Sequence, residues 1–151
     1  VAAIHATWRR EGRPYGDDVG ERIDAALRVT DDRDAVAQGK EWRRSLTAIL
    51  EEATAGGSLV VTPSVADMDK RIGDDRIGDL HYRTVVSWFS APVNPTGLPA
   101  ISAPVAGPGR QPSIQLIGSS HSEPLLMSTA RLLEERGILE IGRWSSDCDA
   151  M

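Results

Sequence analysis

Residues 89–118 read FSAPVNPTGLPAISAPVAGPGRQPSIQLIG, and this stretch decides the fold. Residues 94–97, Asn-Pro-Thr-Gly, carry Asn, Pro and Gly at the first, second and fourth positions of a type I turn. Apolar residues that alternate along 100–105 predict a strand, and 113–117 reads as a second strand. Because the Gly-Pro-Gly at 107–109 reverses the chain between them, we expect the two strands to be neighbours in one sheet.

Upstream of this stretch the sequence favours helices. Three are expected: over 1–11, from Asp17, and from about residue 30 or 31 until Gly56-Gly57 ends the third. The third carries an apolar stripe that we interpret as core packing, formed by Ala35, Trp42, Leu46, Ile49, Leu50 and Ala53. A short apolar run at 58–61 then predicts a buried strand, and 62–79 reads as a polar loop.

Two further helices are expected on either side of the predicted strand pair. The first covers 81–91 and leads into the turn at 94–97. The second begins at Ser122-Glu123-Pro124, with Pro in its first turn, and ends at Gly137. Its buried face is predicted to consist of Leu125, Leu126, Thr129, Ala130 and Leu133. Residues 138–141 read as a short extended piece, and 145–151 as a tail.

Composition limits the partners of the chain. Its 151 residues carry a formal charge of −5, with a pI near 5.2, which argues against nucleic acid or an anionic membrane as a partner. No apolar run approaches the roughly 20 residues that span a bilayer. The one cysteine, Cys148, excludes an internal disulfide framework and a cysteine-based zinc site, and we expect a cytoplasmic protein. Nothing in the sequence calls for a cofactor.

Two patterns suggest a metal site or a nucleophile, and both have a simpler interpretation. Five aspartates of the polar loop do not follow calcium-loop spacing, which favours a solvated loop: Asp67, Asp69, Asp74, Asp75 and Asp79. The run Ser119-Ser120-His121 resembles a nucleophile with its base, but adjacent residues rarely hold that geometry. A strand-to-helix connection capped by Ser122 is the favoured interpretation. His5 and His81 lie in separate elements without metal-ligand spacing.

The central stretch also resembles the C-terminal part of the amidase signature family. The matching residues are Asn94, residues 97–102 (Gly-Leu-Pro-Ala-Ile-Ser), Pro104 and residues 115–118 (Gln-Leu-Ile-Gly), with Pro63 and Ala66 before them and Glu123, Leu125, Leu126 and Ala130 after them. The resemblance covers most of residues 1–137. It implies an α/β fold, a mixed β-sheet flanked by helices, over residues 1–144. It also implies that residue 1 lies inside a helix of a longer protein.

The family resemblance further implies an activity whose catalytic groups lie elsewhere. Amidase signature enzymes cleave an amide C–N bond with two serines and a lysine, and these lie in the N-terminal half of the family. No stretch of this chain maps onto that triad, since Gly56-Gly57-Ser58 lacks the rest of the Gly/Ser-rich motif. The chain is therefore expected to supply sheet and a wall of the substrate pocket, with no catalytic residue of its own. Its expected partners are a small amide substrate and the missing N-terminal half or a partner chain.

The same resemblance marks the residues expected to contact substrate. Members that use glutamine carry an acid and a Thr ahead of the matched Asn94, where this sequence has Ser87 and Ser90. A neutral or aryl carboxamide is thus the expected substrate, with Trp88 and Phe89 as apolar lining, unless Trp88 is simply a core residue. Asn94 is expected to hold the turn through its own side chain, with Gly97 at positive φ. The alternative function is a non-catalytic remnant or interaction module of the same fold.

Overall fold

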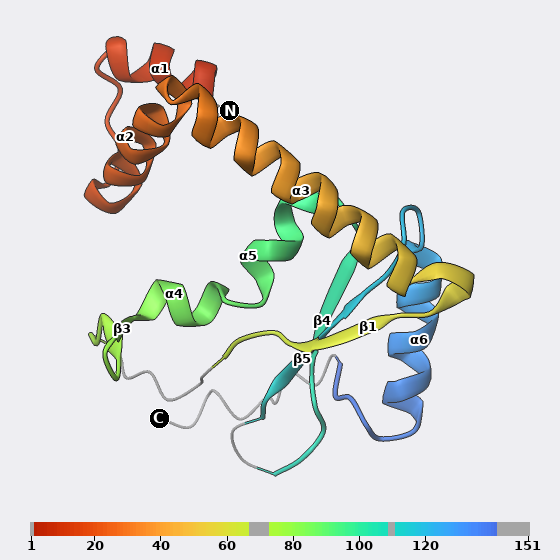
Figure 1. Ribbon diagram of the computed structural model, residues 1–151. Helices are drawn as coiled ribbons and strands as arrows, with labels where there is room; N and C mark the ends of the chain where they lie inside the picture. The colour runs from red at the N-terminus through yellow and green to blue at the C-terminus, as the bar shows by residue number, and fades with distance from the viewer. Residues whose placement is uncertain (1, 67–72, 109–110, 142–151) are drawn as a thin grey trace. The chain divides into compact units, whose positions relative to one another are not determined.

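The computed structural model describes residues 2–66, 73–108 and 111–141 (Figure 1). The chain divides into two compact units, Val1–Ser45 and Leu46–Met151. The first unit holds α1 (Ala2–Arg10), α2 (Asp17–Asp31) and the first part of α3 (Arg33–Ala53). The second holds the remaining elements, including every described strand. The predicted tail at 145–151 lies outside the described residues.

The break between α2 and α3 falls at Asp32, one or two residues beyond the predicted start of the third helix. Asp32 has extended backbone angles, and its Oδ1 accepts hydrogen bonds from the backbone N–H groups of Asp34 (3.1 Å) and Ala35 (3.0 Å). A carboxylate in this position satisfies N–H groups that have no partner within the helix. Asp32 is therefore the N-cap of α3.

The first unit is held together at its surface more than by a core. Among the residues of this unit whose burial is described (5–17 and 19–45), only Gly20 and Ile23 are buried. Arg9 of α1 binds Asp24 of α2 through both Nε (3.0 Å) and Nη2 (2.5 Å). The Arg9 guanidinium also lies 5.8 Å from the ring centre of Tyr15. These contacts join α1 to α2 by charge and aromatic stacking, with little buried apolar area.

The second unit is built on a three-stranded sheet. Its strands are β1 (Val60–Pro63), β4 (Ala100–Pro104) and β5 (Ser113–Ile117), in the order β1-β5-β4. The predicted α/β fold is thus confirmed, as is the expected pairing of the last two strands. Both described pairings are antiparallel, where the resemblance implied a mixed sheet. A hairpin loop joins β4 directly to β5, and such a loop permits only antiparallel neighbours.

Two apolar layers cover the three-stranded sheet, one formed by α6 and one by the segment that contains α5 and η2 (Figure 1). Helix α6 (Glu123–Glu135) packs against β4, and its Leu126 and Ala130 are buried. The predicted face of this helix is confirmed, because Leu125, Thr129 and Leu133 are also at least half-buried. On the other side, Val93, Leu98 and Ile117 form a core cluster joined by Leu50 and Val60.

The chain beyond α6 returns to the edge of β4. Gly137 has φ +69°, and the next residue donates its N–H to the carbonyl of Leu133 (2.9 Å), which closes the helix as predicted. Leu139 then forms an antiparallel bridge with Val105 and is almost completely buried. The short extended piece expected at 138–141 is therefore a partial fourth neighbour in the sheet.

The segment between β1 and the turn at 94–97 differs from the prediction in two places. A small hairpin, β2 (Arg76–Ile77) with β3 (Leu80–His81), begins in the predicted polar loop and ends at the first residue of the predicted helix. The helix predicted over 81–91 is broken into α4 (Tyr82–Ser87) and α5 (Ser90–Val93). Pro92 explains the break, since in a continuous helix its absent N–H would have to bond the Trp88 carbonyl. Because α4 ends at Ser87 and α5 begins at Ser90, Pro92 lies in the first turn of α5, where proline is tolerated.

Much of the predicted apolar stripe of α3 remains outside the core. No residue of α3 is fully buried, and Trp42 and Ile49 are more than half exposed. Leu50 alone of the stripe joins the core cluster of the second unit. None of the described helices is both long enough and apolar enough to cross a membrane.

Candidate substrate-pocket wall

The turn at the centre of the resemblance is a short 3-10 helix, η2 (Asn94–Thr96), followed by Gly97 with φ +75°. The positive φ predicted for Gly97 is confirmed. The side chain that holds the turn is Thr96, whose Oγ1 donates to the Val93 carbonyl (2.7 Å) and accepts from the Leu98 N–H (3.2 Å). Among the described residues the exposed Asn94 side chain makes no such bond, so the prediction that Asn94 holds the turn is wrong. Asn94 has helical backbone angles, and its side chain is exposed.

The turn is anchored to the sheet because the residues on both sides of it are buried. Val93 precedes it and Leu98 follows it, and both join Ile117 of β5 in the core cluster. The backbone N–H of Gly118 donates to the Pro99 carbonyl (3.0 Å), which ties the start of β4 to the end of β5. The segment is therefore fixed to the sheet at its C-terminal end.

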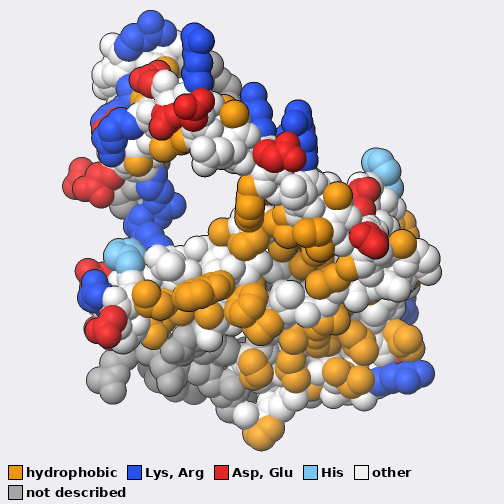
Figure 2. Space-filling view, viewed as in Figure 1, with side chains coloured by type: hydrophobic (Ala, Val, Ile, Leu, Met, Phe, Trp, Pro, Cys, Tyr) orange, Lys and Arg blue, Asp and Glu red, His pale blue; other side chains and the backbone are white. Residues whose placement is uncertain are grey.

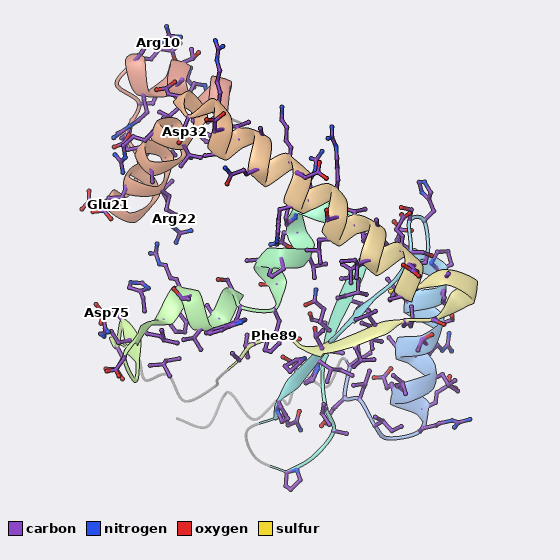
Figure 3. All side chains as sticks on the ribbon, in the orientation of Figure 1. Arg10, Glu21, Arg22, Asp32, Asp75 and Phe89 are labelled. Carbon is purple, nitrogen blue, oxygen red and sulfur yellow. The ribbon has the colours of Figure 1, made fainter. Side chains whose placement is uncertain are left out.

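The other predicted contact residues lie at the junction of α4 and α5. Trp88 and Phe89 form the junction itself, which Figure 3 marks at Phe89. The Trp88 side chain is 54% exposed, whereas Val85, one turn earlier, is 4% exposed. Within the described residues Val85 is the core contact of α4, and Trp88 is free to contact something else.

The two serines of the predicted wall are not equivalent. Ser87 Oγ donates to the Arg83 carbonyl at 2.6 Å, so its hydroxyl is committed to its own helix. Ser90 is half-buried and begins α5, with no side-chain hydrogen bond among the described residues. Asn94 lies at the opposite end of that single helical turn. The structure thus places Trp88, Ser90 and Asn94 along one short segment ahead of the sheet.

The two other patterns noted in the sequence do not form a catalytic site in the described residues. Ser120 Oγ donates to Glu51 Oε1 at 2.6 Å, and His121 has the left-handed φ of +62°. The Ser119–His121 run is a tight connection into α6, as the simpler interpretation held. Ser122 precedes the helix, but its hydroxyl makes no capping bond. The described residues contain no group of three His, Cys, Asp or Glu able to hold a metal ion, and Asp67, Asp69 and Cys148 lie outside them.

Three polar side chains form a row across the sheet that was not predicted from the sequence. Gln115 of β5 lies opposite Thr62 of β1 on one side and Ser102 of β4 on the other. Residues directly opposite in antiparallel strands point to the same face. The signal in the sequence was Gln115 itself, an amide in an otherwise apolar strand end, Gln-Leu-Ile.

Comparison with known proteins places this architecture in a class. No family model and no curated protein matches the chain. A solved structure described as an amidase superposes on 89% of the chain with a TM-score of 0.73 and 22% identity. The A subunit of glutamyl-tRNA(Gln) amidotransferase from Thermotoga maritima superposes on 87% with a TM-score of 0.54 and 25% identity.

The fold is therefore that of part of an amidase, and the resemblance to amidase signature proteins seen in the sequence is confirmed in the structure. The chain spans about a third of these structures, 32% of the first and 30% of the second.

Proposed function

We propose that this chain is part of an amidohydrolase that cleaves carboxamide C–N bonds by serine nucleophilic catalysis. The supporting observation is the superposition of nearly the whole chain on about a third of an amidase. In this proposal the attacking serine, the relay serine and the lysine come from the remainder of the fold. The chain contributes the three-stranded sheet and one wall of the substrate pocket.

The proposed wall consists of Ser87, Trp88, Ser90 and Asn94. The exposure of Trp88 is compatible with the proposal, because a side chain that is more than half outside the core is accessible to a substrate. Neither Ser87 nor Ser90 offers a negative charge for the amino group of a free amino acid. The proposed substrate is therefore a neutral or aryl carboxamide whose apolar part lies against Trp88.

The proposed partner is the remainder of the amidase fold, on the same chain or on another chain in the cytosol. Its docking would cover apolar side chains of the second unit that the described residues leave exposed (Figure 2). Val61 of β1 and Ile49 of α3 are 59% and 61% exposed. These same exposed residues favour the alternative function, a non-catalytic module that binds a partner through this surface.

The test begins with the reading frame upstream of Val1. We expect it to encode a Gly/Ser-rich nucleophile segment, and we expect the longer protein to hydrolyse benzamide and propionamide faster than free glutamine. Replacement of the encoded nucleophile by Ala is the control for contaminating hydrolases. A start codon directly before Val1, or a longer protein that hydrolyses none of these amides, would favour the binding module.

The contribution of Trp88 is tested in the same longer protein. Trp88→Leu keeps an apolar side chain but removes the aromatic face, so we expect kcat/KM for benzamide to fall by more than that for propionamide. The matched control is Tyr82→Leu, which also replaces an aromatic side chain by leucine, six residues before Trp88. Equal changes for both substrates would leave Trp88 without a role in selecting the substrate.

A further inference from the structure

On the face of the sheet that α6 covers, the side chains of β1 are left open. In the antiparallel register Val61 lies opposite Leu116 of β5, and Leu116 lies opposite Ile101 of β4. Residues directly opposite in antiparallel strands point to the same face of the sheet. Exposure nevertheless rises steeply along this row, since Leu116 is 3% exposed and Val61 is 59% exposed. The cover over this row therefore ends between β5 and β1.

The next row, two residues along the strands, repeats the pattern. Pro63 of β1 lies opposite Ile114, which lies opposite Ala103 of β4. Ala103 is 4% exposed and Ile114 is partly buried, but Pro63 is exposed. Both rows lie on the α6 face, because Val60 and Ile117 of the alternate row pack in the core cluster on the other face. The exposed strip therefore continues along β1.

The width of a helix explains where the cover ends. A helix with its side chains is about 10–12 Å across, and the strands of a sheet lie about 4.8 Å apart, so one helix covers about two strands. Helix α6 packs against β4, where it buries Leu126 and Ala130. In the order β1-β5-β4 it can thus reach β5, the next strand, but not β1, the strand beyond it. The place beside α6 has the width of a second helix.

The chemistry of the exposed strip limits what can cover it. Strand β1 reads Val-Val-Thr-Pro and contains no ionisable residue. A charged group buried against it would lose its water without gaining a partner. Helices that flank a sheet bury an apolar stripe on it. The apolar stripe of a second helix is therefore the matching surface.

We propose that a second helix packs beside α6 on Val61 and Pro63, and that this helix belongs to the remainder of the amidase fold, encoded upstream of Val1. The inference rests on the proposed function, because that function assigns the remainder of the fold to this protein. This occupant is favoured over a second copy of the chain because the chain spans only 32% and 30% of the two superposed structures. Most of that fold is thus left to extend the helix layer over β1.

Thiol labelling measures whether Val61 is covered. Val61→Cys is prepared together with Cys148→Ser, in the 151-residue chain and in the longer protein that contains the upstream segment. Ser128→Cys is the matched control, because Ser128 is exposed on the side of α6 opposite to Leu126. We expect a maleimide to react with the thiol at position 61 rapidly in the 151-residue chain and at least roughly ten times more slowly in the longer protein. The rate at position 128 should be the same in both.

Photo-cross-linking identifies what covers the strip. Val61→Met in the longer protein, produced with photo-methionine, keeps an apolar side chain and carries a small diazirine. We expect mass spectrometry to find position 61 cross-linked to one upstream segment whose apolar residues recur at helical spacing. Cross-links to an upstream segment with strand periodicity, to residues 1–151 or to a second copy of the protein would each overturn the inference.

The other outcomes of the labelling experiment also overturn it. Equal rates at positions 61 and 128 of the longer protein would mean that β1 stays open there. Slow labelling of position 61 already in the 151-residue chain would mean that the chain covers β1 itself. If the 151-residue chain does not fold, the ratio of the two rates within the longer protein decides. A reading frame that begins at Val1 would leave no upstream helix to occupy the strip.

The failure of this inference can be told apart from the failure of the proposed function. Amide hydrolysis by the unmodified longer protein tests the function alone. The protection and the cross-links of position 61 test the second helix alone, because neither readout depends on turnover.

Discussion

The two faces of the three-stranded sheet differ in how far this chain completes them. Under α6, the apolar side chains Ala103 and Leu116 of the sheet and Leu126 and Ala130 of the helix are all at most 4% exposed. On the opposite face, Val93 and Leu98 pack on Ile117 at one end, and the other end holds buried side-chain oxygens that have no partner among the described residues. Apolar packing is satisfied by any well-shaped neighbour, whereas a buried polar row needs a particular one. The first face is therefore an apolar core, and the second combines apolar packing with buried polar groups.

The largest effect is expected from opening the completed face. Leu126→Ala removes a buried side chain beneath the sheet and should lower the free energy of unfolding by about 2–5 kcal/mol, the range for Leu in a packed core. Met127→Ala on the same helix removes a side chain that is 62% exposed and should have little effect. Urea unfolding followed by circular dichroism measures both. Similar losses for the two variants would mean that α6 is not packed as described.

The edge of that face can be probed through Gly118. A Cβ atom on Gly118 would clash with Ser122 Oγ and would lie 3.4 Å from Leu59 Cδ2. We expect Gly118→Ala to cost about 1–3 kcal/mol as an overpacked site. Because the Ser122 hydroxyl makes no capping bond, Ser122→Ala alone should be almost neutral and should recover part of the loss in the double variant. A double-mutant cycle in urea unfolding measures the coupling, and strictly additive effects would contradict the clash.

The turn that anchors the opposite face should respond less. Gly97 has φ +75°, and a Cβ there would meet no atom within 4 Å, so Gly97→Ala carries only the conformational cost of about 1–2 kcal/mol. Gly39→Ala in α3 is the control, because a helical glycine without positive φ should gain stability on the same substitution. Thermal unfolding distinguishes the two signs. Stabilisation at Gly97 would mean that the left-handed conformation is absent in solution.

The smallest effect is expected in the first unit, where the contacts lie at the surface. The hydrogen bond and charge of Arg9 lower the pKa of Asp24 below its usual value. A lowered carboxyl pKa adds stability that is present above the unfolded pKa of about 3.9 and is lost as the pH falls through the folded value. We expect Asp24→Asn to reduce helicity slightly at pH 7 and not at pH 2, with high salt weakening the effect. Glu21→Gln on the same helix is the control, and a loss that persists at pH 2 would exclude the ion pair as its cause.

Several features of the structure could be predicted from residues that are close together in the sequence. The positive φ of Gly97, the Pro-containing first turn of α6 and its buried face follow from neighbouring residues alone. The break at Trp88-Phe89 was also readable in principle, since Pro92, four residues after Trp88, removes the bond that a continuous helix needs there. Because the effect of Pro92 was left out of the prediction, α4 and α5 were expected to form one helix. The substrate-pocket wall was assigned from a family resemblance, and the substrate contacts of Ser87, Trp88, Ser90 and Asn94 remain predictions.

The sequence by itself determined the secondary structure near its turns and caps, because those conformations depend on residues a few positions apart. Only the tertiary structure decided that β5 pairs with β1 as well as β4, which brings Thr62 beside Gln115 across more than fifty residues of chain. It also decided that Thr96, and not Asn94, holds the turn, since the backbone angles there depend on the packing of Val93 and Leu98. Whether a polar side chain is buried with or without a partner depends on all of its neighbours at once, and no local pattern reports that.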